Sequence, residues 1–178
     1  MSKIEKYSLK VIIVGEPAVG KTSLVKKFIS GQFSKDYRSS IGTNIFSKRI
    51  KLEKSVNATI QLWDIAGQER WTNMRHLYYS GAKGVLIVGD LTRKNTFDQI
   101  EKFWVPDVKQ YCKIAPILLL ANKNDLERNI SEKQISSLGD HINAISIINT
   151  YAITGENVES AFEIISKQAI KTYYDRII

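Results

Sequence analysis

The residues with the clearest chemistry form one short loop, Gly15-Glu16-Pro17-Ala18-Val19-Gly20-Lys21-Thr22, which directly follows the apolar run 11–14. A G-x-x-x-x-G-K-T pattern between a strand and a helix is typical of a phosphate-binding loop. Its glycines let the backbone curl around a phosphate group, so that successive N–H groups point at the anion. We therefore expect this loop, together with Lys21 and Ser23, to bind phosphates and the Thr22 hydroxyl to bind Mg²⁺.

A second polar group, Asp64 to Gln68, comes at the end of the apolar segment 56–63. Ligands of open α/β sheets bind at the carboxyl ends of the strands, where this group is expected. Asp64 would hold Mg²⁺ through a water, Gly67 would offer its N–H to a γ-phosphate, and Gln68 would orient an attacking water. The alternative is an aspartate that caps the next helix and a glutamine in a polar turn. At this point a kinase, an ATPase and a GTPase all remain open.

The sequence Asn122-Lys123-Asn124-Asp125 follows the apolar segment 116–121 and indicates the base. Guanine presents two adjacent donors, the ring N1–H and the exocyclic amine, and the single Asp125 carboxylate can accept both. Adenine would leave this acid unpaired. We expect Asn122 to tie the phosphate loop to the base loop and the Lys123 stem to cover the purine. If the protein were a kinase, this motif would have no explanation. In another sequence context the same four residues would be an ordinary polar turn.

Apolar runs of strand length alternate with helical patterns, which predicts one α/β domain, residues 1–178, with a mostly parallel sheet. The expected strands are 11–14, 43–52, 56–63, 84–90, 116–121 and 145–149, and the expected helices are 20–29, 70–79, 95–112, 131–139 and 156–175. The second and third strands should form a hairpin that adds one antiparallel edge strand. Pro106 should kink or restart its helix, and Ser131 with Gln134 predicts a capping box.

Composition limits the class of protein. With 43% hydrophobic and 25% charged residues, the chain can form one globular domain with a substantial core. The single cysteine, Cys112, excludes an internal disulfide, and the polar start carries no apolar signal core, so we expect a cytoplasmic location with residues 1–8 flexible. The net charge of +8 comes from scattered lysines and arginines, so we expect no nucleic-acid partner.

Taken together, these motifs resemble the Ras superfamily of small GTPases, and its Rab-like branch, over essentially the whole chain. The resemblance implies a three-layer P-loop G domain with a six-stranded sheet and about five helices. It also implies tight binding of GTP or GDP with Mg²⁺, slow hydrolysis and two switch segments. Phe33 should then stack near the guanine, Tyr37 should fold over the phosphates, and Ser40 should contact Mg²⁺ and phosphate. Residues 150–155 stand at the second guanine loop, which places Thr150, Ala152 and Ile153 beside the base.

Local features refine this resemblance. The run Gln68-Glu69-Arg70-Trp71 and the pair Tyr78-Tyr79 look Rab-like, whereas residues 104–112 resemble Rho proteins. The chain between Asp125 and Thr150 is too short for the additional Rho helix, so we favour the Rab-like branch.

Several residues depart from the family pattern. Ser40 replaces the usual threonine, which predicts a switch that closes less completely. Pro17 stiffens the phosphate loop, and we expect it to obstruct an arginine supplied by a partner. Ile153 and Tyr151 replace a lysine and a serine, so the base should pack less firmly. Residues 173–178 contain no cysteine, so membrane association would depend on an anchor that is absent from this sequence or is not a prenyl group.

The expected partners are effector, exchange-factor and GTPase-activating proteins. A candidate effector surface carries the apolar residues Ile41, Ile45, Trp63, Trp71 and Tyr78, which could instead belong to the core. Two functions remain open, a GTP-hydrolysing switch and a nucleotide-binding scaffold with negligible turnover.

Overall fold

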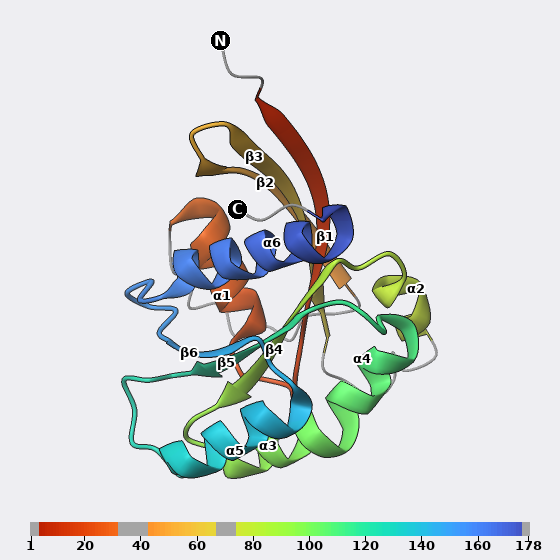
Figure 1. Ribbon diagram of the computed structural model, residues 1–178. Helices are drawn as coiled ribbons and strands as arrows, with labels where there is room; N and C mark the ends of the chain where they lie inside the picture. The colour runs from red at the N-terminus through yellow and green to blue at the C-terminus, as the bar shows by residue number, and fades with distance from the viewer. Residues whose placement is uncertain (1–3, 32–42, 67–73, 176–178) are drawn as a thin grey trace.

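The computed structural model describes residues 4–31, 43–66 and 74–175. Its sheet has six strands in the order β2-β3-β1-β4-β5-β6 (Figure 1). The strands are β1 (Glu5–Val14), β2 (Thr43–Glu53), β3 (Val56–Ile65), β4 (Gly84–Asp90), β5 (Ile117–Asn122) and β6 (Ser146–Thr150). Neighbouring strands pair in parallel except β2, which is antiparallel to β3. The predicted mostly parallel sheet with one antiparallel edge strand is thus confirmed.

Helices cover both faces of the sheet and make three layers (Figure 1). One core joins the sheet to α1 (Lys21–Ser30) and α6 (Val158–Tyr174). The other core lies against α2 (Arg75–Tyr79), α3 (Lys94–Gln99), η2 (Ile100–Trp104), α4 (Val105–Tyr111) and α5 (Glu132–Ile142). The alternation of side chains along a strand divides β1 between the two cores, with Val11 and Ile13 in the first and Ile12 and Val14 in the second. Both faces of the central strands are therefore buried, as in other parallel sheets.

The third predicted helix is interrupted by one π-helical turn. The Val105 N–H donates to the Ile100 carbonyl, five residues back, and Pro106 follows at once. Proline lacks an N–H and its ring would crowd the carbonyl four residues before it, and the wider turn accommodates both effects. The predicted irregularity at Pro106 is confirmed, although its form is a π-turn.

Helix and strand boundaries agree with the sequence patterns to within a few residues, except at one strand. β1 begins at Glu5, six residues before the predicted start. It therefore includes residues 5–8 of the segment 1–8 that the sequence predicted to be flexible. The capping box of Ser131 and Gln134 is present at the start of α5. Only the end of the predicted helix 70–79 falls within the described part, as α2. Among the described residues, no helix is both long and apolar enough to cross a membrane.

Candidate functional site

The loop between β1 and α1 has room for glycine alone at two positions. Gly15 and Gly20 have φ values of +141° and +101°. A Cβ atom at Gly15 would lie 2.4 Å from the Val88 carbonyl oxygen, and one at Gly20 would lie 2.3 Å from Asn122 Nδ2. The loop therefore passes directly against the ends of β4 and β5, which is the edge of the sheet where the other predicted motifs lie.

Lys21, the first residue of α1, is nearly buried, with 6% of its surface exposed. Its Nζ donates to the backbone oxygens of Gly15 at 2.7 Å and Glu16 at 2.8 Å, so the side chain folds over the loop. Burial lowers the pKa of Lys21 to about 8, and the nearby Asp64 carboxylate opposes that shift. Lys21 remains mostly protonated at neutral pH and can exchange these two carbonyls for phosphate oxygens.

Thr22 and Asp64 form a pair of oxygen groups next to Lys21. The Thr22 hydroxyl donates to Asp64 Oδ2 at 2.5 Å, which joins the start of α1 to the end of β3. Asp64 is fully buried. Mg²⁺ prefers hard oxygen ligands and usually takes only one or two protein groups besides phosphates and waters. The hydroxyl and carboxylate present here fit that requirement.

The base motif begins at the end of β5. Asn122 Nδ2 donates to the Val19 carbonyl at 2.8 Å, so the predicted tie between base loop and phosphate loop is present. Its Oδ1 accepts from the Thr150 hydroxyl at 3.0 Å, which joins β6 to the same network. Lys123 follows with φ +67°, and this left-handed turn carries the chain away from the sheet toward Asp125.

The second guanine loop lies beside this motif. Ala152 is 6% exposed and packs into the core, whereas Ile153 is 46% exposed. Tyr151 lies against Asp125: desolvation, the charge of Asp125 and a hydrogen bond to Asp125 raise the pKa of Tyr151. Tyr151 is therefore near the acid expected to read guanine, a proximity that the sequence did not indicate.

A buried carboxylate that no sequence motif marked lies between these loops. Asp90, at the end of β4, is fully buried and accepts from Lys123 Nζ at 2.7 Å and from Arg93 Nε at 2.8 Å. Burial alone would raise the pKa of Asp90, but hydrogen bonds from Lys123, Thr92 and Arg93 outweigh it and lower the pKa. Arg93 Nη2 also donates to the Pro17 carbonyl at 2.9 Å. Asp90 and Arg93 therefore link the base loop to the phosphate loop.

Another side chain of the phosphate loop is held by the π-turn. Trp104 is fully buried and its Nε1 donates to Glu16 Oε1 at 2.9 Å. The Arg75 guanidinium of α2 lies 4.8 Å from the Trp104 ring centroid and 3.5 Å from Asp107. Trp104 thus belongs to the core and also holds a side chain of the phosphate loop.

Several predicted site residues lie outside the described part of the chain. They are Phe33, Tyr37, Ser40, Ile41, Gly67, Gln68 and Trp71. Of the remaining predicted effector residues, Ile45 is 57% exposed, whereas Trp63 and Tyr78 are half-buried with ring centroids 6.4 Å apart.

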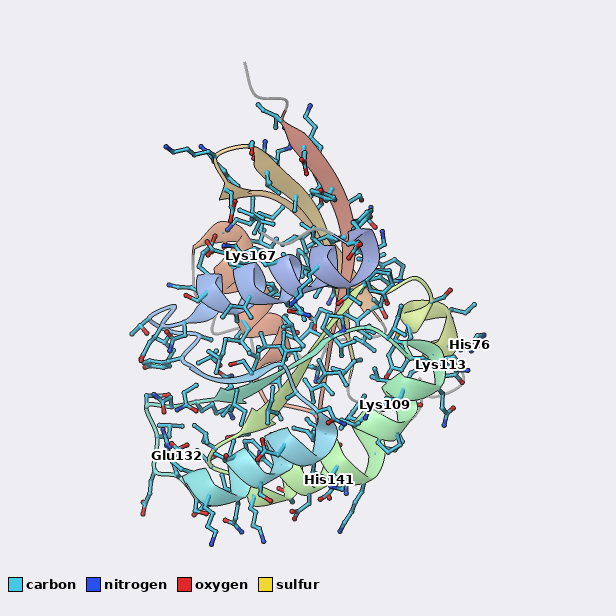
Figure 2. The ribbon with its side chains drawn as sticks, viewed as in Figure 1. His76, Lys109, Lys113, Glu132, His141 and Lys167 are labelled. Carbon is cyan, nitrogen blue, oxygen red and sulfur yellow. The ribbon has the colours of Figure 1, made fainter. Side chains whose placement is uncertain are left out.

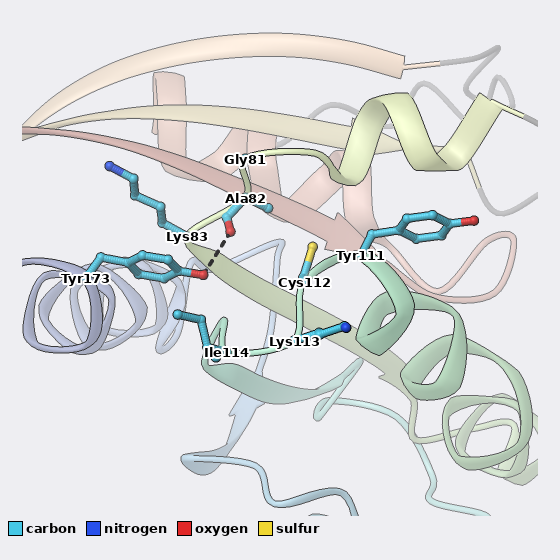
Figure 3. A pocket seen from close by; sticks show the side chains of 8 residues that line it. All are labelled: Gly81, Ala82, Lys83, Tyr111, Cys112, Lys113, Ile114 and Tyr173. Carbon is cyan, nitrogen blue, oxygen red and sulfur yellow. Dashed lines mark hydrogen bonds between the residues drawn. The ribbon is translucent and has the colours of Figure 1, made fainter.

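Other chemically capable residues lie away from these loops. The histidines are on the helical surface, His76 in α2 and His141 in α5 (Figure 2). A cavity of about 340 Å³ opens near the start of β4, between Tyr111, Tyr173 and the buried Cys112 (Figure 3). This end of the sheet is opposite the phosphate loop, and burial raises the pKa of the Cys112 thiol to about 11, so the thiol is a poor nucleophile.

Comparison with known proteins agrees with this geometry. Residues 10–171 match the Ras family. The chain is 37% identical to the Ras-related protein Rab-32B of Dictyostelium discoideum, covering 94% of this chain and 66% of that protein. It is 34% identical to the Ypt/Rab-type GTPase YPT7 of Saccharomyces cerevisiae, over 96% of this chain and 86% of that protein. It is 36% identical to the Ras-related protein Rab-1 of Theileria parva, over 90% of this chain and 74% of that protein. The chain therefore belongs to the Ras family of small GTPases, in its Rab-like branch.

Proposed function

We propose that this chain is a guanine-nucleotide-dependent switch that binds GTP and GDP with Mg²⁺ and slowly hydrolyses GTP to GDP and phosphate. The observation that carries the proposal is the meeting of three groups at one edge of the sheet. Lys21 and Thr22 begin α1, and Asp64 and Asn122 lie at the ends of β3 and β5. Hydrogen bonds join Thr22 to Asp64, and Lys21 and Asn122 to backbone oxygens of the phosphate loop. This proximity supports a single site for phosphate, metal and base.

The phosphate loop binds the anionic end of the nucleotide. Backbone N–H groups of Gly15 and of residues 18–23 surround the phosphates, and Lys21 supplies a positive charge. Thr22, Ser40 and, through a water, Asp64 would hold Mg²⁺. When bound, Mg²⁺ neutralises charge on the β- and γ-phosphates. Tyr37 closes over the phosphates.

Hydrolysis depends on the segment that follows β3. Gln68 orients the attacking water, and the Gly67 N–H donates to the γ-phosphate. Asp64, the last site residue before this segment, is fixed by its burial and by Thr22. Loss of the γ-phosphate releases the contacts of Gly67 and Ser40, which makes the surface of the protein depend on the nucleotide.

The base loop selects guanine. Asp125 accepts from N1–H and the exocyclic amine. The Lys123 stem covers one face of the purine and Phe33 the other. Thr150, Ala152 and Ile153 present the second loop to the base, and the Ala152 N–H faces the base carbonyl.

The alternative is a scaffold that binds nucleotide and hydrolyses almost none. Pro17 and Ser40 are the residues that favour it, because one stiffens the loop and the other loosens switch closure. Binding is tested by titrating fluorescent GDP and ADP against the full chain. We expect GDP to bind far more tightly, and equal affinity would contradict the assignment of Asp125. Turnover is tested by single-turnover release of phosphate from the full chain loaded with Mg²⁺ and GTP.

The biological role follows from the relatives. Because they are Rab and Ypt proteins, we propose a role in membrane traffic or signalling, at a location in the cytoplasm and on membrane surfaces. Exchange factors, activating proteins and effectors would be its partners, the last bound through the surface that includes Ile45, Trp63 and Tyr78.

A further inference from the structure

The strands β1, β3 and β2 extend beyond the helices, and no helix among the described residues covers one of their faces there (Figure 1). On these strands the alternate residues Leu9, Ile60, Leu62 and Ile50 are buried against α1 and α6. The residues between them form what we call the open face, and none of these is buried: Lys6, Ser8 and Lys10 of β1, Asn57, Thr59, Gln61 and Trp63 of β3, and Ile45, Ser47, Arg49 and Lys51 of β2.

Strand register arranges the open face in cross-strand rows. The first row is apolar, with Ile45 opposite Trp63. The next rows contain Ser47, Gln61 and Lys10, then Arg49, Thr59 and Ser8. The last row contains Lys51, Asn57 and Lys6. The surface therefore changes from apolar to cationic over a length of about 20 Å, since each residue advances a strand by about 3.3 Å.

The charge on the open face has one sign. Its charged residues are Lys6, Lys10, Arg49 and Lys51, and it contains no acid. Lys10 is held at the apolar end, where its Nζ lies 3.7 Å from the Trp63 ring centroid and donates to the Ser80 carbonyl at 2.7 Å. The other cations are exposed, and within the described part of the chain none of them pairs with an acid. They form an unneutralised basic end.

We propose that the open face docks an acidic polypeptide segment of the effector, with apolar side chains over Ile45 and Trp63 and carboxylates over Arg49, Lys51 and Lys6. The inference rests on the proposed function, because the apolar row belongs to the effector surface assigned there. Many interfaces combine a central aromatic residue, which contributes most of the affinity, with charged residues at the rim, which orient the partner and accelerate association.

The composition of the open face favours a polypeptide over an anionic membrane. Lipid recognition by basic clusters typically uses four to eight exposed cations, each contributing about 1 kcal/mol near the surface. Here Lys10 is already engaged, which leaves Lys6, Arg49 and Lys51. The middle rows carry hydroxyl and amide groups that match the hydrogen-bonding groups of a peptide.

The test selects binders from a displayed library of random 16-residue peptides on the full chain loaded with a non-hydrolysable GTP analogue. We expect enrichment of peptides with an acidic end and an apolar end. The variant Lys6→Gln/Arg49→Gln/Lys51→Gln should bind them about eightfold more weakly at low salt. This follows from about a twofold loss for each of the three ion pairs between a cation of the open face and a peptide carboxylate. The control Lys94→Gln/Lys133→Gln/Lys171→Gln removes the same charge from exposed sites in other elements and should bind them like the parent.

The outcomes separate the alternatives. Selected peptides without acidic bias, or equal weakening by the control variant, would overturn the proposal. The cations would then serve only to keep the edge strand β2 from pairing with other chains. The proposal would also be overturned, in favour of a lipid partner, by two results together. The selection would yield no acidic peptides, and the parent but not the variant would bind phosphatidylcholine vesicles with 30% phosphatidylserine. Acidic peptides that bind the open face equally in the GDP state would support the docking surface and contradict the proposed switch.

Discussion

Replacing Arg93 by alanine should accelerate the release of GDP about tenfold, because this residue fastens the phosphate loop to the base loop. Its Nε donates to the buried Asp90 carboxylate at 2.8 Å, and its Nη2 donates to the Pro17 carbonyl at 2.9 Å. Asp90 in turn accepts from Lys123 of the base motif at 2.7 Å. Removing Arg93 breaks this link at the phosphate loop and leaves Asp90 with Lys123 and Thr92, so the fold should persist.

The magnitude follows from the bonds that are lost. A hydrogen bond to a charged group contributes about 1.5–3 kcal/mol when well shielded, and a neutral one about 1 kcal/mol. Because 38% of the Arg93 side chain is exposed, solvent screens its hydrogen bond to Asp90, which therefore contributes at the lower end of that range. A loss of about 1.5 kcal/mol from the bound state corresponds to roughly a tenfold change in the rate of release.

The assay is displacement of fluorescent GDP by excess unlabelled GDP in stopped flow. Arg93→Lys keeps the charge but reaches only one of the two acceptors, so its rate should lie between those of parent and alanine variant. Lys94→Ala removes a neighbouring exposed cation from α3 and should leave the rate unchanged. Affinity for GMP, which lacks the β-phosphate, should change less than affinity for GDP. A release rate within twofold of the parent in Arg93→Ala would refute the reasoning.

Three further predictions concern Lys21, Gly89 and Thr22. Burial lowers the pKa of Lys21 to about 8, and phosphates favour its protonated form. The affinity for GDP should therefore be constant below pH 8 and fall as the pH rises above 8. Equal affinities at pH 7 and pH 9, measured by calorimetry, would contradict this. Gly89→Ala would bring a Cβ within 2.6 Å of the Phe97 ring, and this overpacking should lower the free energy of unfolding in urea by about 1–3 kcal/mol. An unchanged urea midpoint would count against the packing described. Chelating Mg²⁺ with EDTA should accelerate GDP release in the parent but much less in Thr22→Ala, whereas equal acceleration would show that Thr22 holds no metal.

The sequence predicted the elements well where hydrophobic patterns were strong. The central strands β4 and β5 are continuous apolar runs that are buried on both faces, so their positions could be read directly. The start of β1 was missed because residues 5–8 are largely polar, and the alternation there marks a strand with one open face. The π-turn before Pro106 could not be foreseen, since proline predicts an irregularity without its form.

The site was predictable where it depends on motifs and unpredictable where it depends on contacts distant in sequence. The tie between Asn122 and Val19 was expected from the base motif and is present. Asp90, Arg93 and the Trp104–Glu16 contact were missed, because no local pattern shows that the ends of β4 and η2 approach the phosphate loop. Such contacts follow from strand order and helix packing, which only the folded chain displays.

The most direct test of the proposed switch is single-turnover release of phosphate from the full chain loaded with Mg²⁺ and GTP, compared with Gln68→Leu. We expect a slow, measurable rate in the parent and a much lower rate in the variant, because leucine cannot orient the attacking water. Both proteins should bind GDP with equal affinity, which shows that the variant is folded. Equal rates would remove Gln68 from the mechanism, and no release from either protein would contradict hydrolysis and favour the nucleotide-binding scaffold.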